Sequence, residues 1–234
     1  AKATTRVLGI YSRITVLDPK NQQAQQRYMD LLYDHGVNLA QVPLLEQLIE
    51  KSSEFLSLDP ENAEALKYRA LAQVEIMKRK EVEEPKIHKA KYDLDAALQR
   101  APEDGDLVRH LSLWYAIRAA RAKDQRSPEV VADLQNSSEQ VLLDYLEKYP
   151  DDLATRLALA RGLFLNNKRD EAKATLAEVV AGVKAVTDTE LLTQVATFLI
   201  VADTTAAATT EGILTTEGLL AAADILNTAY EQEP

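Results

Sequence analysis

Apolar residues recur along most of the chain at intervals of three or four, the spacing that places side chains on one side of an α-helix. Leu153, Leu157, Ala160 and Leu163 follow this spacing. A turn signal at Asn166–Asn167 then precedes a second apolar run that begins at Ala172. No stretch alternates apolar and polar residues for long, as a strand would. The pattern predicts about eleven helices, near residues 3–17, 21–36, 42–57, 62–81, 85–100, 104–124, 128–149, 152–166, 169–183, 188–203 and 213–232.

Two sets of prolines divide these runs at regular intervals. The first set lies at inferred helix ends and is separated by 41, 42 and 48 residues: Pro19, Pro60, Pro102 and Pro150. The second set opens helical patterns and is separated by 42 and 43 residues: Pro43, Pro85 and Pro128. Proline suits the first helical turn but cannot continue a helix past its end. The regular spacing predicts stacked helix pairs, an α-hairpin solenoid, and disfavours a bundle of unrelated helices.

The repeats resemble the tetratricopeptide repeat (TPR) family. Residues 153–186 fit that family's 34-residue unit without a gap. The small residues Ala160 and Ala172 stand where the family's two helices approach closely. The other helix pairs match the family's unit less closely. Four of the five pairs carry about 7 to 16 extra residues between their two helices. The resemblance implies an all-α fold, a right-handed α-hairpin solenoid that forms a TPR-like superhelix. A HEAT-like helical repeat is the structural alternative.

The repeat reading gives the domain organisation. Residues 1–186 are expected to hold the TPR-like repeats, and residues 187–234 to form a final acidic, Thr/Ala-rich helix pair that continues or caps the solenoid. Within the first part, a half repeat is followed by four helix pairs, which gives the ranges 1–19, 20–60, 61–102, 103–150 and 151–186.

Charge is unevenly distributed over the 234 residues. The net charge is −10. Residues 185–234 contain eight acidic residues and no Lys, Arg or His. This balance argues against nucleic-acid or anionic-membrane binding, and no apolar run is long enough to span a bilayer. The acidic end is a docking surface for a basic partner or, as we favour, a solvated surface. The start at Ala1 suggests a segment excised from a longer protein, and the cytoplasm is the favoured compartment.

A search for chemistry finds little. The absence of Cys excludes disulfides, thiolate metal sites and a cysteine nucleophile. His35, His88 and His110 share no metal-binding or catalytic motif, and no phosphate-binding or nucleophile-elbow motif occurs. Trp114–Tyr115 is interpreted as core rather than as a ligand-stacking site. We therefore predict a protein that is not an enzyme and has no cofactor or metal.

If the family resemblance holds, partners bind a groove lined by the first helix of each pair. Lys67, Arg109 and Arg161 would neutralise an acidic peptide there. The alternative is that the next repeat buries some groove positions. The candidate groove residues are Arg27, Asp30, Tyr33, Lys67, Tyr68, Leu71, Arg109, His110, Leu113, Arg161 and Phe164.

The predicted function is a non-catalytic scaffold that binds a peptide or a partner protein. Chaperone-binding members of the TPR family hold a C-terminal carboxylate with Lys and Asn at fixed groove positions. The corresponding pairs here, such as Lys67 with Leu71, lack the Asn, so binding of Hsp70 or Hsp90 tails is not expected. The alternatives are homo-oligomer assembly through exposed repeat ends and, less favoured, a small-molecule sensor domain.

Overall fold

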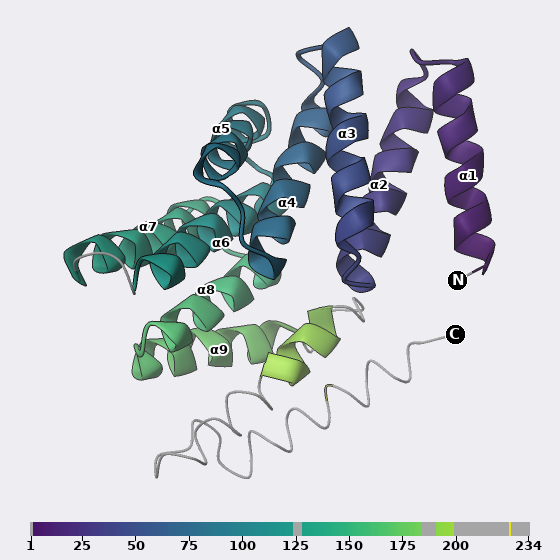
Figure 1. The fold of residues 1–234 in the computed structure, drawn as a ribbon. Coiled ribbons are helices and arrows are strands. Elements are labelled where there is room, and N and C mark those ends of the chain that lie inside the picture. The colour runs from purple at the N-terminus through teal and green to yellow at the C-terminus, as the bar shows by residue number, and fades with distance from the viewer. Residues whose placement is uncertain (1, 124–127, 184–190, 199–224, 226–234) are drawn as a thin grey trace. The chain divides into compact units, whose positions relative to one another are not determined.

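The structure is a computed structural model that describes residues 2–123, 128–183, 191–198 and 225 (Figure 1). Its described residues form helices and connecting turns, with no strand among them. The chain separates into two compact units, Ala1–Gln125 and Arg126–Pro234. The helices of the first unit are α1 (Lys2–Leu17), α2 (Gln22–Asn38), α3 (Val42–Leu58), α4 (Ala63–Arg79), α5 (Glu84–Arg100) and α6 (Gly105–Ala122).

Helices of the first unit pack with their sequence neighbours and also with alternate helices. α2 contacts α4 and α4 contacts α6, so the first helices of successive pairs form one continuous layer. α3 packs against α2 and α4, and α5 packs against α4 and α6. Large apolar side chains fill the space between the layers, among them Met29, Leu32, Leu45, Leu48, Ile87, Leu94 and Leu107. This arrangement is that of stacked helical hairpins, in which neighbouring pairs bury one another.

Two arginines link the first helix of one pair to the first helix of the preceding pair. Arg79 donates from Nη2 to the carbonyl of Val37 at 3.3 Å, at the end of α2. Arg121 donates in the same way to the carbonyls of Met77 and Lys80, at 2.8 and 3.0 Å, at the end of α4. The last carbonyls of a helix lack partners within the helix, so each arginine caps the first helix of the preceding pair. The two arginines lie one repeat apart.

Helix starts follow the first set of prolines closely. Two residues after each of these prolines, a side-chain oxygen accepts a hydrogen bond of 2.9–3.0 Å from a backbone N–H of the first turn. The capping residues are Asn21, Asn62, Asp104 and Asp152. Asn and Asp are the residues most favoured at this position, because they satisfy N–H groups that have no partner within the helix.

Replacing Asn62 with alanine is expected to lower the free energy of unfolding by about 1 kcal/mol, because Ala65 N–H loses the Asn62 oxygen at 2.9 Å. Glycine at the same position should cost only a few tenths of a kcal/mol, since glycine tolerates the cap conformation and leaves the N–H groups open to water. Urea denaturation of both variants and of Asn62→Asp checks this. An aspartate variant as unstable as the alanine variant would contradict the capping role.

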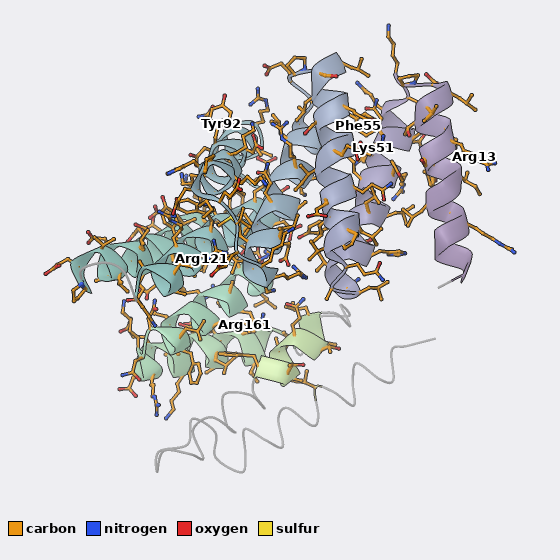
Figure 2. All side chains as sticks on the ribbon, in the orientation of Figure 1. Arg13, Lys51, Phe55, Tyr92, Arg121 and Arg161 are labelled. Carbon is orange, nitrogen blue, oxygen red and sulfur yellow. The ribbon has the colours of Figure 1, made fainter. Side chains whose placement is uncertain are left out.

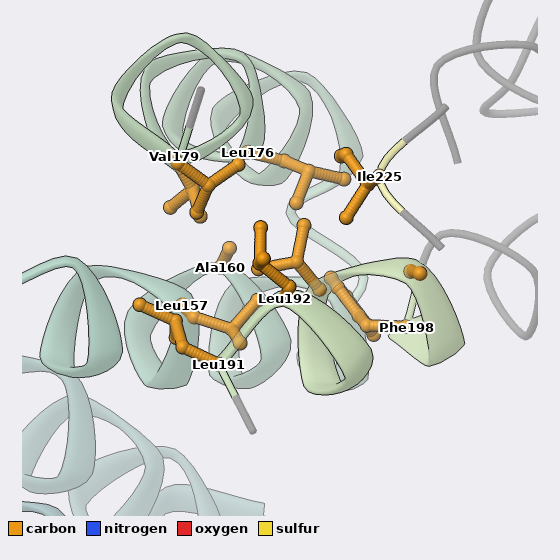
Figure 3. Close-up of a cluster of buried hydrophobic side chains, with 11 residues drawn as sticks. Leu157, Ala160, Leu176, Val179, Leu191, Leu192, Phe198 and Ile225 are labelled. Atoms are coloured by element: carbon orange, nitrogen blue, oxygen red, sulfur yellow. The ribbon is translucent and has the colours of Figure 1, made fainter. Parts of the chain in front are cut away.

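The second unit contains α7 (Pro128–Leu146), α8 (Leu153–Leu165), α9 (Arg169–Val183) and the helical residues 191–198. Its core joins α8, α9, residues 191–198 and Ile225 (Figure 3). Glu139 of α7, itself buried, accepts hydrogen bonds from Asn166 and Lys168 at 2.7 and 2.5 Å, which ties α7 to the α8–α9 turn. Buried apolar side chains of this core are Leu157, Ala160, Leu176, Val179, Val183, Leu191, Leu192, Val195, Ala196, Phe198 and Ile225.

The helices predicted from periodicity are confirmed for residues 2–183. Their ends differ from the expected positions by at most three residues. Residues 191–198 confirm part of the helix predicted at 188–203, whereas the helix predicted at 213–232 lies outside the described residues except for Ile225. The assignment of repeat boundaries along the chain stays a prediction. Among the helices that the structure describes, none has the length and apolar character needed to cross a membrane.

Candidate interaction surface

Aromatic and polar side chains predicted for the groove meet on the layer of first helices. Tyr33 of α2 and Tyr68 of α4 lie with ring centroids 5.8 Å apart. His110 of α6 faces Tyr33 from the other side, with 6.3 Å between centroids. We name this surface the first-helix face, formed by Arg27, Asp30, Tyr33, Lys67, Tyr68, Arg109, His110 and Leu113. Three helices that are distant in sequence thus contribute to one surface.

Hydrogen bonds join the aromatic residues of the first-helix face. The Tyr68 hydroxyl donates to Asp30. His110 Nδ1 lies 2.7 Å from the Asp106 carbonyl, to which it can only donate, and its Nε2 lies 3.0 Å from the Tyr33 hydroxyl. Burial, followed by the charges of Glu75 and Asp106, raises the pKa of Tyr33, and burial with the Asp30 bond raises the pKa of Tyr68. Both hydroxyls therefore stay protonated.

A buried carboxylate lies beneath this surface. Glu75 is only 5% exposed, is paired with Arg79, and lies 3.6 Å from His110 Nε2. Burial by itself would raise the pKa of Glu75, but the interactions with His110 and Arg79 outweigh it and lower the pKa to about 2. Glu75 is therefore ionised under ordinary conditions and fixes the positions of Arg79 and His110. Arg79 was not among the candidate residues, although its spacing from Arg121 by one repeat was visible in the sequence.

Lys67 and Arg109, two of the three cations of the first-helix face, have close acidic partners. Lys67 Nζ lies 2.6 Å from Asp104 and 4.0 Å from Asp106. Arg109 pairs with Asp106 at 2.5 Å. Burial would raise the pKa of Asp106, yet Arg109 outweighs it and lowers the pKa. An acidic peptide would have to compete with these internal acids, so the structure weakens the expectation that Lys67 and Arg109 serve to neutralise one.

The structure contradicts the prediction that Leu71 lines the groove. Its side chain is 1% exposed and belongs to the core of α4. The reason is that α4 lies between α2 and α6, so this position is enclosed, whereas the equivalent Asp30 of α2 stays partly open. Leu71 therefore offers no side-chain surface to a partner. Leu113 of α6 stays half-buried.

Arg161, labelled in Figure 2, and Phe164 lie on α8 of the second unit, and both contact residues 191–198. Arg161 donates to the carbonyl of Gln194 at 3.0 Å, and its guanidinium lies 5.5 Å from the Phe198 ring centroid. Phe164 meets Phe198 edge to face at 5.9 Å. Burial lowers the pKa of Arg161. The alternative stated from sequence, that the following repeat covers some groove positions, holds for these two residues.

Other candidate chemistry is structural or absent from the described residues. Trp114 is buried, and its indole N–H donates to the Ile87 carbonyl at 3.0 Å, so it is core rather than a stacking platform. Within the ranges that the structure describes, no cluster of His, Asp and Glu is arranged to hold a metal ion. A pocket of about 450 Å³ lies among α3, α4 and α5, with an apolar floor of Ile49, Ile76 and Met77.

Known proteins are similar to this chain in structure. No protein-family model and no curated protein matches the sequence. TTC0263, a thermophilic TPR protein of Thermus thermophilus, is 19% identical, with 88% of this chain and 92% of that chain covered at a TM-score of 0.59.

Two further similarities are more distant. YrrB, a TPR protein with an unusual peptide-binding site, is 17% identical, with 96% and 92% covered at a TM-score of 0.47. The human IFIT1 dimer with m7Gppp-AAAA is 15% identical, with 100% and 56% covered at 0.48. The Thermus similarity, together with the packing of α1 to α6, shows that this chain has the all-α repeat fold of TPR proteins.

Proposed function

We propose that this chain is a non-catalytic protein-interaction scaffold that binds a peptide or a segment of a partner protein on the first-helix face. The observation that supports this most is the convergence of Tyr33, Tyr68 and His110 from three helices. Tyr is enriched among residues that dominate binding energy at interfaces. Their hydrogen bonds to Asp30 and Asp106 hold the rings in place before binding, which reduces the entropy lost on association.

The partner proposed here makes hydrogen bonds and apolar contacts with the tyrosines and is not held mainly by charge. Lys67 and Arg109 are compensated within the chain, and Arg27, which lies 3.6 Å from Asp30, keeps 64% of its side chain exposed. Peptides with a free carboxylate, such as chaperone tails, are therefore expected to bind poorly. Neither catalysis, a cofactor nor nucleic-acid binding is part of the proposal.

Substituting the face should abolish capture of its partner. We expect Tyr68→Ala and Tyr33→Ala each to lose a protein that the wild type captures from cell lysate, because each removes an aromatic contact of the face. Tyr92→Ala is the matched control, since Tyr92 is an exposed tyrosine on α5. Mass spectrometry identifies the captured protein, and hydrogen exchange with the purified partner should show protection of α2, α4 and α6. Capture that survives both face variants would contradict the proposal.

Two other functions have weaker support. Self-assembly through an exposed repeat end is favoured by the apolar residues that α1 leaves in solvent, such as Ile10 and Leu17. A sensor role would use the pocket among α3, α4 and α5, where the side-chain oxygen of Gln73 is buried without a hydrogen-bond partner. Native mass spectrometry that detects a co-purified small molecule would favour the sensor.

A further inference from the structure

One face of α1 is apolar and has no partner helix within the described residues of the first unit. Val7, Ile10, Ile14 and Leu17 are three, four and three residues apart, which places them on one side of the helix. Leu17 is 85% exposed and Ile10 56%, whereas Thr15, on the side toward α2, is buried. In a stack of repeats, each helix pair buries its apolar surface against neighbours on both sides. Within the first unit, α1 packs chiefly against α2.

The same helix carries uncompensated positive charge. Residues 2–17 contain Lys2, Arg6 and Arg13 and no acid, a net charge of +3. Arg13 extends away from the ribbon of α1 (Figure 2), and neither Arg6 nor Arg13 has an acidic partner among the described residues. Other arginines of the first unit pair with acids distant in the sequence, as Arg100 does with Glu61 and Arg118 with Glu84. The α1 face, defined here as Arg6, Val7, Ile10, Arg13, Ile14 and Leu17, therefore lacks both an apolar and an acidic counterpart within the described residues of the first unit.

The last fifty residues have the opposite composition. Residues 185–234 contain eight acids and no Lys, Arg or His, a charge of −8. No other part of the sequence has so large an excess of one sign. Opposite charges on two surfaces of one molecule favour association of one copy's basic surface with the acidic surface of the next.

We propose that the α1 face of one copy binds the acidic C-terminal fifty residues of a second copy. The contact joins two different surfaces, so it is head-to-tail and adds further copies into chains or rings instead of stopping at a symmetric dimer. Apolar contact with Ile10 and Leu17 supplies affinity, and Arg6 with Arg13 selects the acidic end and fixes the direction. This inference deepens the self-assembly alternative and is independent of the first-helix face.

Sedimentation velocity of the purified chain tests the proposal. From about 1 to 100 µM protein, the average mass should rise with concentration and exceed that of a dimer. Raising the salt from about 0.02 to 0.5 M should weaken association, because exposed charges are screened. A monomer at every concentration would overturn the proposal, and so would association that stops at a dimer or ignores salt.

Substitutions locate the two surfaces. Ile10→Glu/Leu17→Glu and Arg6→Glu/Arg13→Glu should each weaken association by about tenfold or more, since like charges then face the acidic end. The control is Leu58→Glu, because Leu58 is likewise an exposed last residue of a helix. It should associate as the wild type does. Circular dichroism checks that every variant is folded. Equal loss in the control, or no loss in the α1 variants, would contradict the assignment.

A charge exchange tests the partner surface directly. A tail variant with Glu211, Glu217, Glu231 and Glu233 changed to Lys should not associate with itself. The Arg6→Glu/Arg13→Glu variant also associates poorly with itself. A mixture of the two variants should regain association. Failure of the mixture to associate would exclude the tail as the occupant. Tyr68→Ala should self-associate normally, so that failure of this inference and failure of the peptide-binding proposal are distinguished.

Discussion

Replacing Asp93 with alanine is expected to lower the free energy of unfolding by about 3–5 kcal/mol, the usual cost of removing one partner from a buried ion pair. Asp93 is fully buried and accepts two hydrogen bonds from Arg69, at 2.8 and 2.9 Å, which join α4 to α5. Lys89 adds a third at 2.8 Å, and Arg69 reaches Ser53 of α3 at 3.4 Å. Without the carboxylate, the guanidinium of Arg69 is left without its counter-charge in a largely buried place. Urea denaturation measures the loss.

Asp95 provides the matched control two residues away on the same helix. It pairs with Lys91 at 2.7 Å in an i,i+4 contact with much of its side chain in solvent. Asp95→Ala should therefore cost only about 0.3–0.5 kcal/mol. The double variant Asp93→Ala/Arg69→Met should recover part of the loss, because it removes the unpaired charge as well. Equal effects of Asp93→Ala and Asp95→Ala would contradict the burial argument.

The contrast between these two aspartates shows which features the sequence could not predict. Asp93 and Asp95 stand in one helical run with lysines four residues earlier, so local spacing treats them alike. Only the packing of α4 against α5 places Asp93 opposite Arg69, at a separation of 24 residues. Helices and their starts were predictable because periodicity and capping act within a few residues, as at Asn62 after Pro60.

The first-helix face was predictable to the extent that it follows the repeat. Tyr68 and His110 lie 42 residues apart, one repeat, so their joint position on neighbouring first helices could be inferred. The prediction for Leu71 was wrong because helical periodicity gives the side of the helix on which a residue lies, but not whether that helix has a neighbour on both sides. α4 lies in the middle of its layer and is enclosed on both sides, whereas α2 is not. The internal partners of Lys67 and Arg109 were missed as well: Asp104, a helix cap, also pairs with Lys67, and Asp106 pairs with Arg109.

Replacing Glu75 with glutamine is expected to remove much of the protein's acid sensitivity. The fold lowers the pKa of Glu75 from 4.5 to about 2. As the pH falls below about 5, the unfolded chain takes up this proton first, so the stability that Glu75 contributes is present above that pH and is lost toward pH 2. A shift of this size corresponds to about 3 kcal/mol. The glutamine variant should therefore be about 3 kcal/mol less stable at pH 7, and the difference should shrink steadily as the pH falls.

Urea denaturation at several pH values between about 7 and 3 measures this difference, and other carboxylates cancel because both proteins contain them. Asp34→Asn is the control of opposite sign. Burial, and then the charge of Asp30, raises the pKa of Asp34, so its ionised form opposes folding. Asp34→Asn should therefore be more stable than the wild type at pH 7 and lose that advantage in acid. A difference between wild type and Glu75→Gln that stays constant with pH would show that Glu75 stabilises the fold by packing and not through its charge with Arg79 and His110.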